Sequence, residues 1–301
     1  MTNRNKGLAL ILCTAIISGF SVFINSYSVK MVDPSTFTFL KNSIVSVAIL
    51  AVILGLTRLK EITKLSLRQW ANLALIGLIG GSIPFLLFFN GLAAAGAANG
   101  SFIHKSMFLY VAAAAVIFLK EKLNPKILLA AVVLLIGNLL VLKAAIFNPG
   151  PGHLLVFGAT VMWAIENIIS KRLLKDLNGN TVAFGRMFFG SIFLLAYLGL
   201  TNGLGPIGAM TSGQWIWTII PSVLLFGYVL TWYNGLKHVP VNLATVILLI
   251  GSPITTVLNL AMLQKPAGAL EWAGIIMIFA GCLAWLKWQK NKPRLSGAHS
   301  I

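Results

Sequence analysis

The hydrophobic positions of the chain form long runs that polar residues, prolines and glycines separate. A helix needs about 20 mostly apolar residues to cross the hydrocarbon layer of a membrane. The runs have this length and are apolar on most faces, and none shows the alternation of a membrane β-strand. The pattern predicts ten transmembrane helices, at roughly residues 7–29, 35–56, 71–92, 96–119, 126–147, 152–170, 181–201, 215–235, 240–263 and 269–288.

The composition agrees with a membrane protein. Hydrophobic residues make up 58% of the 301 residues and charged residues 10%, whereas soluble domains have about 45–50% and about 25%. This excludes an ordinary soluble enzyme and a disordered chain, because too few polar residues are available to face water. Cys13 and Cys282 lie far apart and the four histidines lack ligand spacing, so we expect no disulfide, metal or other cofactor.

The net charge of +17 has to be interpreted from the positions of the basic residues along the chain. With ten crossings, both ends of the chain share one side of the membrane. That side holds 17 of the 23 Lys and Arg residues, the other side holds 3, and 3 lie inside the runs. Cytoplasmic loops retain Lys and Arg, so both termini are predicted to be cytoplasmic, in an inner or plasma membrane. The charge thus indicates orientation in a lipid bilayer and not a nucleic-acid partner.

Short sequence matches recur at a nearly constant offset of 144–145 residues. Asn90-Gly91-Leu92 returns as Asn234-Gly235-Leu236, and Phe39-Leu40-Lys41 returns as Phe184-Gly185-Arg186. Each copy has five predicted helices, an odd number, so the second copy must be inverted across the membrane. The loop at residues 58–70 carries four basic residues and its counterpart at 202–215 carries none, as inversion requires.

The predicted fold class is therefore an all-α integral membrane protein built from two inverted five-helix repeats. The repeats occupy residues 1–147 and 152–288, and residues 289–301 form a cytoplasmic tail. Inverted repeats are the construction of many secondary transporters, because two pseudo-symmetric halves can move about a site at the midplane.

Three local features carry a resemblance to a known family. They are Met162-Trp163-Ala164-Ile165 followed by Ser170-Lys171-Arg172, the basic residues Lys41 and Arg186 early in the second and seventh runs, and Lys120-Glu121-Lys122-Leu123 after the fourth run. With these features the chain resembles the EamA-like family of the drug/metabolite transporter superfamily. Pro253 fits that family's ninth helix, whereas the fourth run has Tyr110 or its neighbours where the family usually has proline. The resemblance implies export of amino acids, drugs or other small metabolites, often coupled to protons.

Ionisable side chains inside the runs are the first candidates for a site, since each costs about 2.5–3.5 kcal/mol to insert. Glu166 is the only carboxylate well inside any run, and we predict that it binds substrate and couples transport to protons. The alternative is a structural ion pair with Lys171 or Arg172. Lys105 lies near the centre of the fourth run, where it would pair with Glu166 or with an anionic substrate group. Its neighbour His104 is a second candidate, or else bonds to an adjacent helix.

The repeat-equivalent residues Lys41 and Arg186 lie near the start of their runs. Long basic side chains at such depths can reach back to the membrane interface, so a structural role is favoured for both.

Uncharged polar and aromatic residues inside the runs complete the candidates. Such groups more often join helices than contact substrate. Trp163 precedes Glu166 by three residues and shares nearly the same helix face, so it is predicted to form a wall of the cavity. The candidates are Asn25, Asn90, Tyr110, Trp163, Asn167, Tyr228, Trp232 and Asn234.

The charges inside the runs, three basic and one acidic, predict a substrate with an anionic group, such as an amino acid or organic acid. The predicted function is secondary-active export of small metabolites by alternating access. A non-transporting membrane scaffold or receptor and an exporter of cationic drugs remain alternatives. An enzyme is not expected, because six acidic residues, one of them deep in a run, cannot assemble a catalytic cluster. The expected partners are a small-molecule substrate and the lipid bilayer, and a homodimer stays open.

Overall fold

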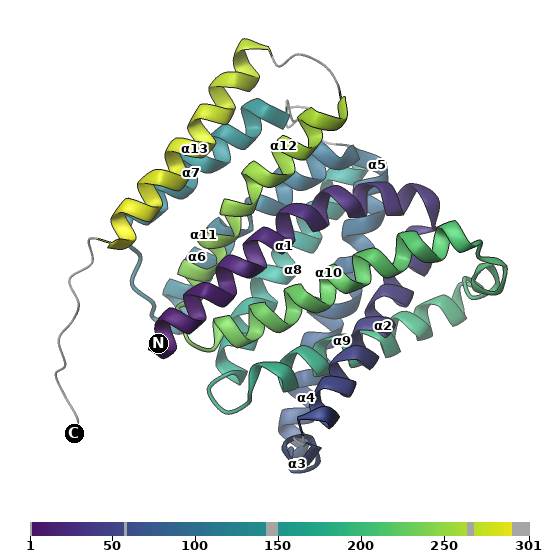
Figure 1. The fold of residues 1–301 in the computed structure, drawn as a ribbon. Coiled ribbons are helices and arrows are strands. Elements are labelled where there is room, and N and C mark those ends of the chain that lie inside the picture. The colour runs from purple at the N-terminus through teal and green to yellow at the C-terminus, as the bar shows by residue number, and fades with distance from the viewer. Residues whose placement is uncertain (1, 57–58, 143–149, 264–267, 291–301) are drawn as a thin grey trace, which may run out of the picture.

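The computed structural model describes residues 2–56, 59–142, 150–263 and 268–290, and every regular element in these residues is a helix (Figure 1). This confirms the all-α prediction for the described part of the chain. The first half contains α1 (Asn3–Met31), α2 (Pro34–Gly55), α3 (Leu59–Thr63), α4 (Leu67–Ile76), η1 (Gly77–Ser82), α5 (Ile83–Lys105), α6 (Met107–Leu119) and α7 (Pro125–Leu142). The second half contains α8 (Pro151–Leu173), α9 (Gly179–Leu200), η2 (Gly205–Ala209), α10 (Ser212–Leu236), α11 (Val241–Leu248), η3 (Leu249–Gly251), α12 (Ser252–Leu263) and α13 (Ala269–Lys290).

Seven helical segments among the described residues are long and apolar enough to cross a membrane. Three further apolar segments are shorter, at Leu128–Val141, Val241–Gly251 and Ala269–Ala284. The chain is therefore a multi-pass membrane protein, and the count of ten crossings stays a prediction. Of the predicted tail at 289–301, residues 291–301 lie outside the described part of the chain.

The ends of several helices follow from local sequence. Asp33 accepts hydrogen bonds from the amides of Ser35 and Thr36, and Pro34 occupies the first turn of α2, where its missing N–H costs nothing. Reciprocal capping boxes begin α4 and α10. Their residues, Ser66 with Gln69 and Thr211 with Gln214, are separated by the repeat offset of 145.

Three predicted runs are interrupted in the structure. In the third, the π-helical η1 separates α4 from α5, and in the ninth, η3 separates α11 from α12. In the fourth, a turn at Ser106 separates α5 from α6. Gly96, where α5 bends, lies at the start of that run, and its φ of 81° is in the left-handed region that glycine adopts without strain. Irregular backbone at membrane depth is tolerated only where protein or a cavity surrounds it, so these breaks point to a functional site.

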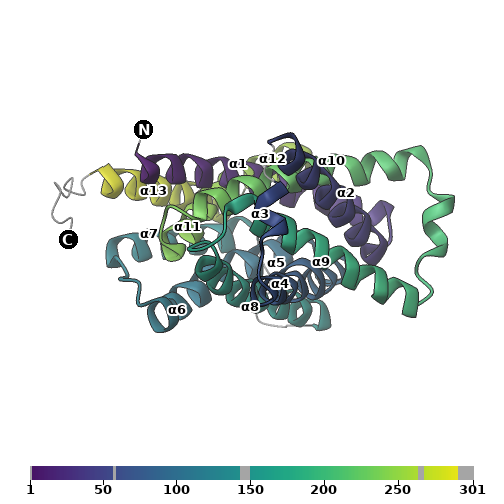
Figure 2. The ribbon, with the colours of Figure 1, turned by 90° about the horizontal axis from the view of Figure 1, so that it is seen from below.

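The helices pack in pairs that join the two halves of the chain. Helix α1 lies along α10, α5 along α8, α2 along α9 and α7 along α13 (Figure 1). Viewed from below, α1, α10 and α13 lie in one layer, and α5, α6 and α8 lie in the other (Figure 2).

Glycines allow two of these helix pairs to approach closely. A Cβ on Gly235 of α10 would lie 3.1 Å from the carbonyl oxygen of Gly7, and a Cβ on Gly152 of α8 would lie 3.1 Å from that of Gly91. Gly7 and Gly152 are 145 residues apart, and Gly91 and Gly235 are 144 apart. The same contact thus occurs twice, with the two halves exchanged.

The close packing of α9 on η1 yields a test of stability. A Cβ on Gly190 would stand 2.6 Å from the carbonyl oxygen of Gly81, and backbone cannot rotate away. We expect Gly190→Ala to lower the free energy of unfolding by about 1–3 kcal/mol, measured as a lower melting temperature of the purified protein. Gly199→Ala in the same helix is the control, because nothing lies within 4 Å of its Cβ position. Equal melting temperatures for the two variants would contradict this account of the packing.

Candidate functional site

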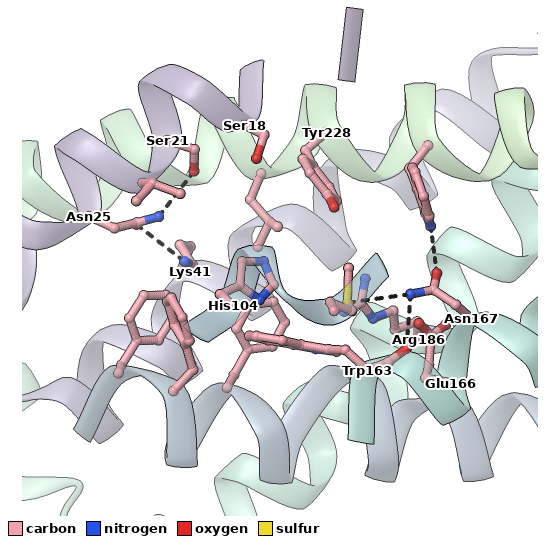
Figure 3. Close-up of a pocket in the computed structure, with 17 residues that line it drawn as sticks. Ser18, Ser21, Asn25, Lys41, His104, Trp163, Glu166, Asn167, Arg186 and Tyr228 are labelled. Atoms are coloured by element: carbon pink, nitrogen blue, oxygen red, sulfur yellow. Dashed lines mark hydrogen bonds between the residues drawn. The ribbon is translucent and has the colours of Figure 1, made fainter. Parts of the chain in front are cut away.

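A pocket of about 700 Å³, including its opening, lies where helices of the two halves meet. Its walls carry three charged side chains, several aromatic rings and uncharged polar groups (Figure 3). The lining residues are Ser18, Ser21, Val22, Asn25, Lys41, Phe85, Phe88, Phe89, His104, Met107, Trp163, Glu166, Asn167, Arg186, Leu225, Tyr228 and Trp232.

One charged group of the pocket consists of Arg186 and Glu166, which meet around Gly80. A Cβ on Gly80 would lie 3.1 Å from both Arg186 Nε and Glu166 Cδ, so these two atoms are no more than twice that distance apart. Glu166 Oε1 accepts hydrogen bonds from the hydroxyl of Tyr233, at 2.6 Å, and from the hydroxyl of Ser170. Both charged side chains are buried, and their opposite charges partly offset the cost of that burial.

The π-helical turn η1 explains how the backbone takes part in this group. The carbonyl oxygen of Gly80 accepts hydrogen bonds from Arg186 Nη2 at 2.8 Å and from Trp163 Nε1 at 2.9 Å. The next carbonyl, that of Gly81, accepts from Asn42 at 2.5 Å. The widened turn therefore presents consecutive carbonyl oxygens to donors from α2, α8 and α9.

The second charged group consists of Lys41, Asn25 and Ser21. The Lys41 amine donates to Asn25 Oδ1 at 3.4 Å, and Asn25 Nδ2 donates to Ser21 Oγ at 3.0 Å. The amine also lies over aromatic rings, 4.1 Å from the centre of Phe89 and 4.8 Å from that of Phe37. Lys41 is only 1% exposed. Figure 3 shows this group at the opposite end of the pocket from Arg186 and Glu166.

Aromatic side chains form the wall between the two charged groups. The Trp163 ring lies 4.9 Å from the imidazole of His104 and 5.3 Å from the ring of Phe88. Asn167 holds this wall together, since it donates to the Trp163 carbonyl at 2.9 Å and accepts from Trp232 Nε1 at 3.1 Å. The pocket therefore offers flat apolar surface with a charged group at each end.

Seven of the residues proposed to bind substrate line this pocket. They are Glu166, His104, Trp163, Asn25, Asn167, Tyr228 and Trp232. Their roles in substrate binding remain predictions.

From their depth we expected Lys41 and Arg186 to reach back to the membrane interface, but they do not. Both side chains are buried and line the pocket. The reason is that each has partners inside the bundle, Asn25 and aromatic rings for Lys41 and the Gly80 carbonyl for Arg186.

Lys105 is not paired with Glu166. Its amine donates to Asn138 Oδ1 at 3.2 Å and lies at a smaller adjoining cavity, to which Thr245 and Thr255 also contribute. His104 borders both cavities. The two neighbours therefore share the smaller cavity, and only His104 also lines the main pocket.

The alternative of an ion pair from Glu166 to Lys171 or Arg172 is not supported. Lys171 donates to the carbonyls of Leu236 and Val239, at 2.6 and 2.7 Å. Arg172 donates to the carbonyl of Phe118 at 2.8 Å. These basic side chains thus cap helix ends and join loops.

Three uncharged candidates lie away from the pocket. Asn90 is exposed and donates to the carbonyl of Leu86 in its own helix. Tyr110 packs against Phe157, with 5.8 Å between ring centres. Asn234 donates to Asn180 at 2.6 Å, which joins α10 to the start of α9.

Sequence reasoning missed other residues of the site. The rings of Phe85, Phe88 and Phe89 carry no signal within apolar runs, although they form much of the wall. Ser21 could have been found, because it stands 145 residues before Glu166.

Two segments of the chain, residues 5–143 and 150–286, match the EamA-like transporter family. The protein therefore belongs to the EamA-like transporter family, and the predicted resemblance is confirmed. The two matches also show that the family unit occurs twice in the chain. Among the described residues, no group of three or more His, Cys, Asp or Glu could hold a metal ion.

Relatives of the chain are named as transporters. The uncharacterized transporter YyaM of Bacillus subtilis (strain 168) is 25% identical over 285 residues, which cover 89% of this chain and 91% of the relative. The S-adenosylmethionine uptake transporter of Rickettsia prowazekii (strain Madrid E) is 30% identical over 41% of each chain. The riboflavin transporter ImpX of Fusobacterium nucleatum subsp. nucleatum (strain ATCC 23726 / VPI 4351) is 23% identical over 261 residues. The aligned residues cover 81% of this chain and 85% of the relative.

A solved crystal structure has the same fold, with a TM-score of 0.75. The match covers 94% of this chain and 98% of the chain in that structure, at 19% sequence identity. This likeness concerns the fold alone.

The two asparagines Asn167 and Asn90 provide a matched test of the pocket wall. Asn167→Ala leaves the buried Trp232 N–H without its acceptor, and we expect a loss of about 1–3 kcal/mol in unfolding free energy. Asn90→Ala removes only an exposed amide and should stay within about 0.5 kcal/mol of the wild type. Thermal unfolding of the purified variants measures both. Equal losses would show that Asn167 does not hold the wall.

Proposed function

We propose that this protein is a secondary-active transporter that exports small metabolites with an anionic group, such as amino acids or organic acids. The observation that carries the proposal is the buried pocket between the two halves, with two basic side chains and one acidic side chain on its wall. In a formal count with His104 neutral, Lys41 and Arg186 exceed Glu166 by one positive charge. An anionic group on the substrate would offset this charge inside the bundle.

Alternating access is the proposed mechanism. The exchanged contacts of Gly7 with Gly235 and Gly91 with Gly152 support two equivalent halves. We assign the halves to residues 1–147 and 152–288, inverted with respect to each other. Such halves can open a central site to either side of the membrane in turn. The bias of the basic residues supports cytoplasmic termini in an inner or plasma membrane.

The alternatives fit the pocket less well. An exporter of cationic drugs needs a free carboxylate, whereas Glu166 already has Arg186 nearby and two hydroxyl donors. A scaffold or receptor without transport has no need for charged side chains buried in a pocket, which are costly. The names of the relatives favour transport of small organic molecules, although one of them names uptake. Export is therefore our inference from the resemblance.

Reconstituted protein tests the function. Proteoliposomes are screened with a library of labelled amino acids, organic acids, uncharged metabolites and lipophilic cations. We expect flux of at least one carboxylate compound above that of protein-free liposomes, and Asn90→Ala should retain this flux because Asn90 lies away from the pocket. Flux of lipophilic cations only would overturn the anionic substrate class. An absence of flux for every compound would overturn the transport function.

Proton coupling gives a second test at Glu166. A buried carboxylate facing the pocket can bind and release a proton, whereas glutamine of nearly the same shape cannot. We expect Glu166→Gln to abolish flux driven by a pH gradient while flux down a substrate gradient persists. The measurement compares both conditions in proteoliposomes. An unchanged dependence on the pH gradient would rule out Glu166 as the coupling group.

A further inference from the structure

Two groups of residues at the pocket, called half-sites here, correspond through the repeat; Ser170 and Tyr233 do not line the pocket but contact Glu166. Each position of the first half-site is followed 144 or 145 residues later by its counterpart in the second. The first half-site consists of Ser21, Asn25, Lys41 and Phe89, and the second consists of Glu166, Ser170, Arg186 and Tyr233.

The two half-sites share their internal contacts. In the first, Asn25 donates to Ser21 across one turn of α1, and in the second, Ser170 donates to Glu166 across one turn of α8. Each half-site also sets a cation beside an aromatic ring. Lys41 Nζ lies 4.1 Å from the ring centre of Phe89, and the guanidinium carbon of Arg186 lies 5.9 Å from that of Tyr233.

The half-sites differ in charge at one position. The second half-site has a carboxylate, Glu166, where the first has the hydroxyl of Ser21. Arg186 therefore has an opposite charge beside it. The contacts that the structure gives Lys41 are neutral, namely Asn25 Oδ1 and aromatic ring faces. Glu166 is the one acidic residue that lines the pocket in the described part of the chain.

We propose that Lys41 is the specificity-determining residue that binds the anionic group of the substrate, while Glu166 keeps Arg186 neutralised. The unpaired charge of the pocket then lies in the first half-site, at a side chain only 1% exposed. A buried ammonium without a counter-charge is costly, so an incoming carboxylate gains a strong, charge-assisted hydrogen bond. This inference rests on the proposed function and defines its substrate class as monoanions.

The aromatic wall indicates what the remainder of the substrate looks like. The ring of Phe85 lies 5.3 Å from Lys41 Nζ and 5.4 Å from the guanidinium carbon of Arg186. Phe85 also packs edge-to-face on Trp163, at 5.2 Å between ring centres. A flat apolar body resting on these rings places its carboxylate at Lys41. The predicted ligand is therefore a monocarboxylate with an aromatic or other flat apolar group.

Substitution of Ser21 tests the inference by supplying the missing charge. Phenylacetate and its uncharged analogue phenylacetamide are the probes, and binding to the full chain in detergent is measured by calorimetry. The wild type should bind phenylacetate more tightly than phenylacetamide. We expect Ser21→Glu to weaken phenylacetate binding at least about tenfold, because the new carboxylate occupies Lys41. The matched neutral variant Ser21→Gln should stay within about threefold of the wild type, and Lys41→Gln should lose the preference for the anion.

Thermal unfolding without ligand gives a readout that needs no probe. A carboxylate at position 21 should pair with Lys41, so Ser21→Glu should unfold at a higher temperature than Ser21→Gln. A lower temperature would overturn the inference, as would unchanged phenylacetate binding in Ser21→Glu. Equal binding of the two probes by the wild type, or binding of neither, would also overturn it. If the proteoliposome screen then showed flux of uncharged compounds, the transport function would be supported and only the anionic substrate class would be overturned.

Discussion

The cost of holding charge inside an apolar helix bundle governs the centre of this structure. Arg186 donates to the Gly80 carbonyl and lies near the carboxylate of Glu166, which in turn accepts a hydrogen bond from Tyr233. These partners exist only because η1 interrupts the helix and because Gly80 has no side chain to separate the two charges. The break in the backbone, the small residue and the two neighbouring opposite charges thus belong to one arrangement. Lys41, by contrast, has only neutral partners among the contacts described.

Much of the fold could be predicted from the sequence, because the length of each apolar run and the offset between the repeats can both be read along the chain. Run length identifies membrane helices, and each predicted run coincides with helical residues in the described part of the chain. The repeat offset identifies equivalent positions, which later proved to make equivalent contacts. Parts of the site could be predicted for a similar reason. Glu166 is a carboxylate deep in an apolar run, and Trp163 lies one turn before it, so both reach the same pocket.

The rest of the site could not be predicted, because a sequence gives the depth of a residue in a helix but not the neighbour it faces. Lys105 and Asn90 lie at suitable depths, yet Lys105 turns to Asn138 and Asn90 turns outward. Lys41 lies near the start of its helix, where Asn25 and the adjacent aromatic rings keep it inside. In helices that are apolar on most faces, hydrophobic periodicity does not reveal the buried side. For that reason the sequence does not show which phenylalanines line the pocket.

The glycine contacts have a consequence for how such a protein could move. Gly7 touches Gly235 and Gly91 touches Gly152, and each contact joins backbones from opposite halves of the sequence. These contacts tie α1 to α10 and α5 to α8, so they cross the boundary between the two duplicated units and do not lie within either unit. A movement that kept α1 with α10 and α5 with α8 would leave both contacts intact, whereas a movement that carried the two units apart would have to break them.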